Sequence, residues 1–316
     1  MISVIIPVYN GEGIIGRCLE SLMMQAKKPD EIILVDDGSS DRTKDVVRKY
    51  RDVILLEQMH KGPAAARNFG AKKSKGDILL FTDADCTLHE NWVSEMAKPF
   101  GDKAIAGVQG RYSTTQKSVM ARFVQLEIED RYDRMKRFKN IDFIGSYSAG
   151  YKKDIFIRSG GFDETFPVAS GEDPELSFKL AKAGHKMVFN DKAIVYHNHV
   201  SSLGPYLKQK FSRAYWRVLL YKKHPDKMKS ESYTPQTLKI QIAFLYLSLL
   251  LAMLYFLIPP AAYLSLLFAI LLIFSAIPLS LKNFRKDKIV GILTPFISIL
   301  RTAVFSIGLV YGAIKL

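Results

Sequence analysis

The sequence predicts an α/β domain with a mostly parallel sheet, followed by a basic amphipathic segment and a group of membrane-spanning helices. Three observations carry this prediction. Short apolar runs alternate with segments of helical periodicity over residues 1–200, which is typical of parallel sheets covered by helices. Polar clusters follow three of those runs, and almost every residue beyond 238 is apolar. We therefore expect three regions, at residues 1–200, 201–238 and 239–316.

Four strands are expected in the first region. Each is a short apolar or β-branched run, and the first ends at the turn signal Asn10-Gly11. Helical periodicity follows the first and second runs, and a third helix is expected at 64–73. The first run has no basic segment before it, so it predicts a strand rather than a signal peptide. The four expected strands are residues 3–8, 31–35, 53–57 and 77–81.

Polar residues stand where three of these strands end. The clusters are Tyr9-Asn10, Asp36-Asp37 and Asp83-Ala84-Asp85. In parallel sheets the carboxyl ends of the strands meet at one edge, and ligands bind there. Acidic residues are also good turn formers. Three clusters in register nevertheless favour a binding site over three unrelated turns.

Asp83 and Asp85 form an Asp-x-Asp pair directly after a buried strand. Two carboxylates at this spacing can approach one divalent cation together with the hydroxyls of a bound nucleotide. Oxygen ligands select hard cations, so we expect Mn²⁺ or Mg²⁺ as the cofactor. Such a cation neutralises a diphosphate and makes it a better leaving group.

The two cysteines and the charge narrow the class of protein. Cys18 and Cys86 have no metal-knuckle spacing, so we expect no disulfide framework and a reducing setting. The formal net charge is +14, from 45 basic and 31 acidic residues. No nucleic-acid recognition motif accompanies this charge, so we expect no nucleic-acid partner.

The second region, residues 201–238, mixes aromatic and aliphatic residues with Lys and Arg. This composition predicts a helix in the lipid headgroup region, although an ordinary surface helix would have a similar pattern. The third region contains apolar stretches at 240–258, 261–281 and 289–314, each long enough to cross a bilayer. Pro295 and Arg301 interrupt the last stretch, so we expect it to be kinked or partly re-entrant, giving two to three transmembrane helices.

Basic residues flank these stretches on one side. Residues 203–239 hold nine Lys or Arg against two acidic residues, and the loop 282–288 holds four against one. Basic flanks favour the cytoplasmic side, and they attract anionic lipids. We therefore expect a multi-pass protein of the cell membrane, with residues 1–200 in the cytoplasm and anionic membrane lipids as partners.

Four segments, in this order, resemble the inverting family 2 glycosyltransferases of GT-A fold, whose domain is Rossmann-like. They are PVYNGEG, VDDGSSD, KGPAAARNFGAKKSKGDILLFTDADC and GGFDE-(x6)-GEDPELSFKLAKAGHK, within residues 2–200. The resemblance implies hexosyltransferase activity with a UDP- or GDP-sugar donor. It implies that the base is recognised by Asp36 or Asp37, that Asp85 is the direct metal ligand, and that the nucleotide-sugar is bound by Pro7, Val8, Tyr9, Lys61, Arg67 and Asp83. Arg67 could instead only brace the acidic loop.

Gly171-Glu172-Asp173 matches the family's acidic motif in the acceptor half. There the aspartate serves as general base and takes a proton from the attacking hydroxyl. We therefore expect Asp173 to be the base and Glu172 to orient the acceptor. The pair also suits the start of a helix, where the dipole favours negative charge, and both interpretations hold together.

Two further groups are candidates by resemblance. His197 and His199 lie two residues apart on an expected strand, so both imidazoles share one face and could join the metal site. Membrane synthases of the family carry a Gln-x-x-Arg-Trp motif, whereas this chain has Gln209, Arg213 and Trp216 at a broken spacing. Arg213 could still bind the diphosphate, but the broken motif argues against processive polymerisation.

The combined prediction is sugar transfer to a hydroxyl of a lipid-linked saccharide or glycolipid. The alternative of the same fold is a polyprenyl-phosphate sugar synthase, whose ionised acceptor needs no base. The presence of Asp173 in its motif argues against that alternative. A glycan-carrier transporter or scaffold with an inert domain is disfavoured by Asp83, Asp85 and Asp173.

Overall fold

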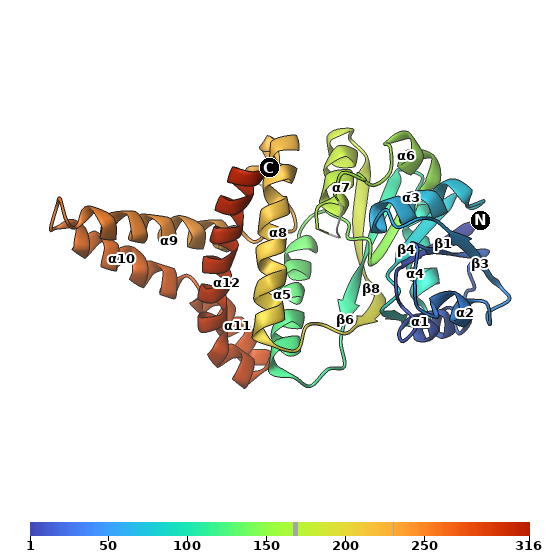
Figure 1. The fold of residues 1–316 in the computed structure, drawn as a ribbon, viewed down its shortest axis with the longest axis horizontal. Coiled ribbons are helices and arrows are strands. Elements are labelled where there is room, and N and C mark those ends of the chain that lie inside the picture. The colour runs from blue at the N-terminus through green and yellow to red at the C-terminus, as the bar shows by residue number, and fades with distance from the viewer. Residues whose placement is uncertain (167–169, 230) are drawn as a thin grey trace. The chain divides into compact units, whose positions relative to one another are not determined.

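The structure, a computed structural model, describes residues 1–166, 170–229 and 231–316 (Figure 1). The chain groups into two compact units. The first comprises Met1–Thr115, Tyr132–Asn198 and Lys223–Tyr233, and the second Gln116–Arg131, His199–Lys222 and Thr234–Leu316.

The first unit is built on one eight-stranded sheet in the order β3-β2-β1-β4-β7-β6-β8-β5. β1 pairs in parallel with β2 and β4, and β2 with β3, so the predicted parallel half is confirmed. β7 runs antiparallel to both β4 and β6. The strands are β1 Ile2–Val8, β2 Glu31–Asp36, β3 Val53–Glu57, β4 Ile78–Thr82, β5 Cys86–Leu88, β6 Ile105–Ser113, β7 Ser148–Lys152 and β8 Lys186–His197.

Helices cover this sheet because each has an apolar face. In α1, Ile15, Cys18, Leu19 and Leu22 recur at helical spacing and all are buried. On α4 the indole of Trp92 is fully buried, and its Nε1 donates to Ser148 Oγ of β7 at 2.8 Å. The short helices of this unit are α1 Ile15–Met23, α2 Thr43–Val47, α3 Pro63–Lys73, α4 Trp92–Ala97, α6 Lys153–Arg158 and α7 Glu172–Lys182, with 3-10 turns at Lys98–Gly101 and Pro225–Met228.

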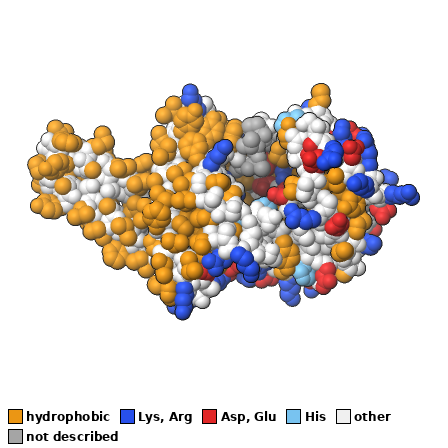
Figure 2. Space-filling model, turned by 60° about the horizontal axis from the view of Figure 1, so that its bottom comes forward, with side chains coloured by type: hydrophobic (Ala, Val, Ile, Leu, Met, Phe, Trp, Pro, Cys, Tyr) orange, Lys and Arg blue, Asp and Glu red, His pale blue; other side chains and the backbone are white. Residues whose placement is uncertain are grey.

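The second unit is helical. It contains most of α5 Val119–Met135 and of α8 Leu203–Lys223, followed by α9 Gln236–Leu254, α10 Ala261–Phe274, α11 Ile277–Lys286 and α12 Lys288–Lys315. By length and composition, Gln236–Leu254, Ala261–Lys286 and Lys288–Lys315 are apolar enough to cross a membrane. The surface over the α9–α10 hairpin is almost entirely hydrophobic, whereas acidic and basic side chains are dense on the first unit (Figure 2).

α12 continues through Pro295 without a break. A proline inside a helix leaves the carbonyl four residues earlier without its usual N–H donor. Here Ser280 Oγ of α11 donates to that carbonyl, Gly291 O, at 2.8 Å. The corner between α11 and α12 therefore supplies the missing hydrogen bond, and the expected interruption does not break the helix.

Candidate active site

Asp36 and Asp37 end β2, and the structure gives them different surroundings. The carboxylate of Asp37 accepts hydrogen bonds from the backbone N–H groups of Lys61 at 2.9 Å and Gly62 at 2.8 Å. Asp36 Oδ2 accepts from Ser39 N at 3.1 Å. Asp36 Oδ1 is shielded from water and has no partner among the described residues. Asp37 therefore holds the loop before α3, and Asp36 keeps one acceptor oxygen.

The end of β1 lies beside this loop. Asp37 N donates to Val8 O at 2.8 Å, which joins the ends of the two strands. Pro7 and Val8 are buried, whereas the ring of Tyr9 is half-exposed and lies 4.1 Å from the ring of His60, centroid to centroid. The expected base-recognition residues are thus adjacent, and His60 adds an aromatic ring that the sequence did not single out.

Asp83 and Asp85 follow β4 and lie with Cys86 in one group whose potential ligand atoms are within 4.8 Å of one another. His197 Nε2, at the end of β8, is 3.2 Å from Asp85 Oδ2. Burial acts to raise the pKa of Asp85, but the hydrogen bond and charge of His197 outweigh it and hold that pKa below its ordinary value. Asp85 is therefore ionised at neutral pH.

The donor set of this group fits a hard divalent cation. Its two carboxylates, with the imidazole of His197 beside Asp85, are suited to Mn²⁺ or Mg²⁺. Burial, with Asp83 and Asp85 nearby, raises the pKa of the Cys86 thiol well above its ordinary value. The fit to such a cation therefore rests on the two carboxylates rather than on the Cys86 thiol.

Arg67 of α3 connects the two acidic motifs. Its Nη2 is 2.6 Å from Asp83 Oδ1 and its Nη1 is 3.4 Å from Glu172 Oε1, and its side chain is only 3% exposed. Removing one partner of such a buried ion pair costs about 3–5 kcal/mol. Arg67 therefore braces the acidic loop, as one of the two sequence interpretations held. Its expected place beside the ribose stays a prediction.

Asp173 lies in the first turn of α7, next to the buried Glu172. Its Oδ2 accepts from Ser146 N at 3.0 Å and Ser146 Oγ at 3.3 Å. Its Oδ1 is shielded from water and, in the part of the chain that the structure describes, has no hydrogen-bond partner. Burial and the charge of Glu172 raise the pKa of Asp173 to about 7, with Arg67 opposing the shift. A carboxylate with this pKa can accept a proton near neutral pH.

Gly171 is required at the start of α7 for a steric reason. A Cβ atom built on this residue would lie 2.2 Å from Cε1 of Phe166, a side chain that is itself buried. Any larger residue would therefore displace the ring or the helix start that holds Glu172 and Asp173.

Ser146, which binds Asp173, lies in the loop before β7, and this loop also contains Asp142 and Phe143. The loop contacts Lys223–Tyr233, which we call the return segment because it rejoins the first unit after α8. Lys227 Nζ is 2.7 Å from Asp142 Oδ2. The ring of Tyr233 stacks on Phe143, with 3.7 Å between centroids. Neither the return segment nor Ser146 was identified from the sequence, because their partners lie far away along the chain.

The remaining two candidates belong to the second unit. His199 is buried, and its Nε2 is 2.9 Å from Gln125 Oε1. Arg213 is half-buried on α8. Their expected roles, as metal ligand and diphosphate ligand, stay predictions.

The chain is similar to known glycosyltransferases. The family model described as glycosyl transferase family 2 matches residues 3–160. A glycosyltransferase of Haloferax volcanii, AglE, is 28% identical over 221 residues, covering 66% of this chain and 70% of that protein. A pre-mycofactocin glycosyltransferase of Mycobacterium tuberculosis is 29% identical over 235 residues, covering 72% of this chain and 48% of the relative. This chain thus spans about half of the mycobacterial protein.

Two solved structures share the fold. A mannosyltransferase from Pyrobaculum calidifontis in complex with GDP-Man and Mn²⁺ has a TM-score of 0.61 at 20% identity, covering 99% of this chain and 86% of its own. GalNAc-T7 with UDP, GalNAc and Mn²⁺ has a TM-score of 0.52 at 18% identity, covering 74% and 52%. At these identities the likeness concerns the fold alone, and that fold is GT-A.

The ordered motifs, the GT-A sheet and the match to the family model agree with one another. They make the protein a glycosyltransferase with three C-terminal helices that fit membrane anchoring. The chain belongs to glycosyl transferase family 2.

Proposed function

We propose that this protein transfers a sugar, with inversion, from a UDP- or GDP-sugar to a hydroxyl of a lipid-linked saccharide or glycolipid. Asp173 carries the proposal. Its pKa of about 7 and its Oδ1, which has no hydrogen-bond partner among the described residues, suit a base that must take a proton from a neutral hydroxyl. A phosphate acceptor would already be ionised and would need no such group.

The residues divide the reaction between two halves of the site. Asp83, Asp85 and His197 would hold Mn²⁺ or Mg²⁺, which when bound neutralises the diphosphate of the donor. Arg67 fixes Asp83 relative to Glu172 through its two contacts. Ser146 orients Asp173, so that Oδ2 is occupied and Oδ1 is left for the acceptor proton. The Mn²⁺ and GDP-Man of the Pyrobaculum structure support a nucleotide-sugar and a divalent cation.

A cytoplasmic membrane face is the proposed location. The three apolar helices support anchoring, and the basic residues of α8 support contact with anionic lipids. The basic residues of 282–288, which the structure places at the end of α11 and the start of α12, support this location less than the composition predicts, because Lys282 and Lys286 pair with Asp130 and Glu129 of α5. We also propose residues 1–200 as the catalytic domain, 201–238 as the juxtamembrane segment and 239–316 as the membrane domain.

The test uses the purified full chain with labelled UDP- and GDP-sugars, Mn²⁺ or Mg²⁺, and extracted membrane lipids. We expect one donor base to be preferred and the metal to be required. Labelled lipid is then treated with mild acid, which releases sugars joined through phosphate. Release of the label as a monosaccharide identifies a polyprenyl-phosphate sugar synthase, whereas label that stays in an acid-stable glycosidic bond, within an oligosaccharide or on the lipid, supports the hydroxyl acceptor.

A further inference from the structure

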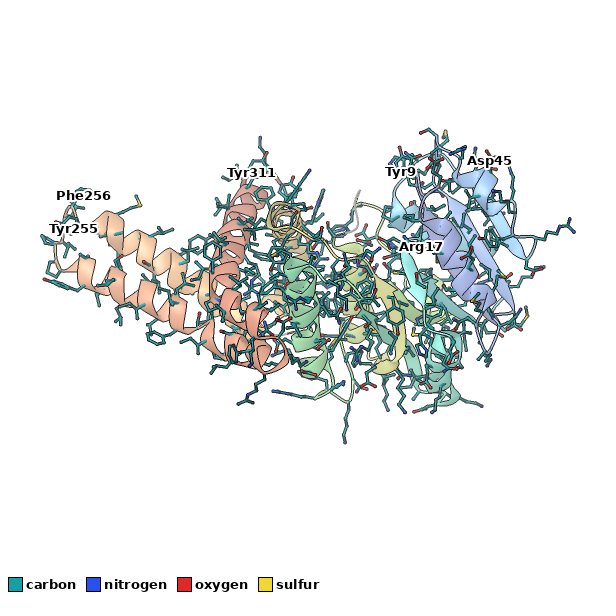
Figure 3. All side chains as sticks on the ribbon, turned by 90° about the horizontal axis from the view of Figure 1, so that it is seen from below. Tyr9, Arg17, Asp45, Tyr255, Phe256 and Tyr311 are labelled. Carbon is teal, nitrogen blue, oxygen red and sulfur yellow. The ribbon has the colours of Figure 1, made fainter. Side chains whose placement is uncertain are left out.

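The apolar helices of the second unit are of two kinds. We compare the most apolar 18-residue stretch of each helix by the share of it that is buried inside the protein. This share is 11% for Gln236–Leu254 and 17% for Ala261–Lys286, but 44% for Lys288–Lys315. α9 and α10 form a hairpin with Tyr255 and Phe256 at its tip (Figure 3). α12 lies across the long direction of this hairpin in both ribbon views (Figures 1 and 3). If the hairpin follows the bilayer normal, α12 cannot follow it too.

The middle of α12 is bound to charged helices. Arg301 Nη1 is 2.9 Å from Glu127 Oε1 of α5, and Lys210 Nζ of α8 is 2.7 Å from Glu127 Oε2. Gln241 of α9 accepts from the other guanidinium nitrogen of Arg301 at 2.9 Å. Arg301 is therefore neither exposed to lipid nor reaching toward the end of its helix, because its partner comes from α5.

The beginning of α12 is bound to α5 as well. Asp287, which caps α12 by accepting from Val290 N, is 2.7 Å from Arg122 Nη1. Lys286 Nζ is 2.6 Å from Glu129 Oε2. These pairs involve Arg122 and Glu129 of α5, and Glu127, the partner of Arg301, lies between those two residues in the sequence.

The last part of α12 packs directly on α8. A Cβ atom on Gly308 would be 2.7 Å from Phe211 O, and one on Gly312 would be 2.7 Å from Tyr215 O. The contacts advance by four residues on both helices, so the two run alongside each other in the same direction. Small residues at this spacing allow close backbone approach. Lys208, Arg213 and Arg217 of α8 lie along the same stretch.

We infer that α12 does not cross the membrane but lies in its plane, at the headgroup boundary, together with α8. α5 holds Arg122, Glu127, Glu129, Asp130 and Arg131 within ten residues, and such a helix cannot enter hydrocarbon at several kcal/mol per charge. Because α12 is attached to α5 and α8 at its beginning, middle and end, it stays at their depth. Its exposed residues Ile292, Phe296, Ile307 and Ile314 then form an apolar face toward the acyl chains.

The α9–α10 hairpin is then the element that crosses. The 19 residues of α9 span about 28 Å, close to the roughly 30 Å of a hydrocarbon core. Two crossings return the chain to the side from which it started. The end of α12 is thus on the same side as the catalytic unit, whereas three crossings would place it on the opposite side.

Single cysteines in the full chain test this in cells. Met24→Cys marks the catalytic unit, Phe256→Cys the hairpin tip and Lys315→Cys the end of α12; all three positions are exposed. Native Cys18 and Cys86 are buried, so the unaltered chain is the unlabelled control. An impermeant thiol reagent labels some positions in intact cells and others only after lysis. We expect Lys315→Cys and Met24→Cys to share one of these two behaviours and Phe256→Cys to show the other. The inference would be overturned if Lys315→Cys were labelled under the same condition as Phe256→Cys. It would also be overturned if Phe256→Cys were labelled under the same condition as Met24→Cys.

A depth measurement provides a second readout that does not depend on reagent access. Spin labels at Ile289, Phe296 and Ile307 sample the exposed face of α12. An in-plane helix gives one shallow depth for all three. A spanning helix instead places the label at Phe296 about 10 Å deeper than that at Ile289, from the rise of 1.5 Å per residue. That gradient would contradict the inference even if labelling in cells were incomplete.

Discussion

The two aspartates on which the site depends, Asp85 and Asp173, have opposite surroundings. Asp85 is half-exposed, and His197 keeps its pKa below the ordinary value. Asp173 is shielded beside Glu172, and its pKa is raised to about 7. One carboxylate is thus ionised at neutral pH, whereas the other changes protonation near neutral pH. The difference comes from neighbours rather than from residue type, and it separates a cation ligand from a base.

The largest expected effect comes from removing the base. Asp173→Asn keeps the shape and one acceptor oxygen for Ser146 but cannot take a proton. We expect kcat to fall by about 10²–10⁴, with donor affinity, measured by calorimetry, nearly unchanged. Asp154→Asn, an exposed acid on α6, is the matched control. If Asp173→Asn retained most of its activity, the hydroxyl-acceptor assignment would be wrong.

The raised pKa of Asp173 predicts a pH profile. Below about pH 7 the carboxyl is protonated, so kcat should fall about tenfold for each pH unit on the acid side and level off above pH 7. Initial rates from pH 5 to 8.5 at saturating donor and metal measure this. A profile whose acid limb is the same in Asp173→Asn would assign the titration to another group.

Replacing His197 tests the role of Asp85 as a cation ligand. His197→Gln removes the imidazole beside Asp85, and we expect metal affinity to weaken by about 10–100-fold. Excess Mn²⁺ should restore much of the rate. His199→Gln is the parallel variant, because both histidines are predicted ligands. Equal shifts in metal affinity support both histidines as ligands, whereas no shift in His199→Gln supports a structural role for His199 beside Gln125.

The smallest effect is expected at the return segment. Tyr233→Ala removes the ring stacked on Phe143, which is worth about 0.5–1.5 kcal/mol. Since Phe143 belongs to the loop that holds Asp173, we expect a several-fold loss of kcat and a shifted acid limb, with KM for the donor unchanged. Tyr233→Phe keeps the ring and therefore separates the effect of the stacking from that of the hydroxyl. A change in KM alone would make Tyr233 a donor contact.

Local patterns predicted the first half of the sheet, because each strand there is one apolar run with its polar residues directly after it. They also predicted that Asp83 and Asp85 lie together at the end of one strand. Ser146 and Asp142 could not be found in this way, since nothing near them in sequence shows that α7 and the return segment contact them. The partner of Arg301 was likewise invisible, because Glu127 precedes it by 174 residues.

The raised pKa of Asp173 also has a consequence for thermal stability. The pKa of about 7 in the folded protein lies above the ordinary value of about 3.9 expected in the unfolded chain. The folded state therefore holds a proton that the unfolded state releases, and this contribution to stability is full below about pH 4 and is lost as pH rises through 7. The melting temperature and the turnover rate then move in opposite directions along the pH scale. A variant with asparagine at this position escapes that loss, so an inactive protein would melt later than the active one.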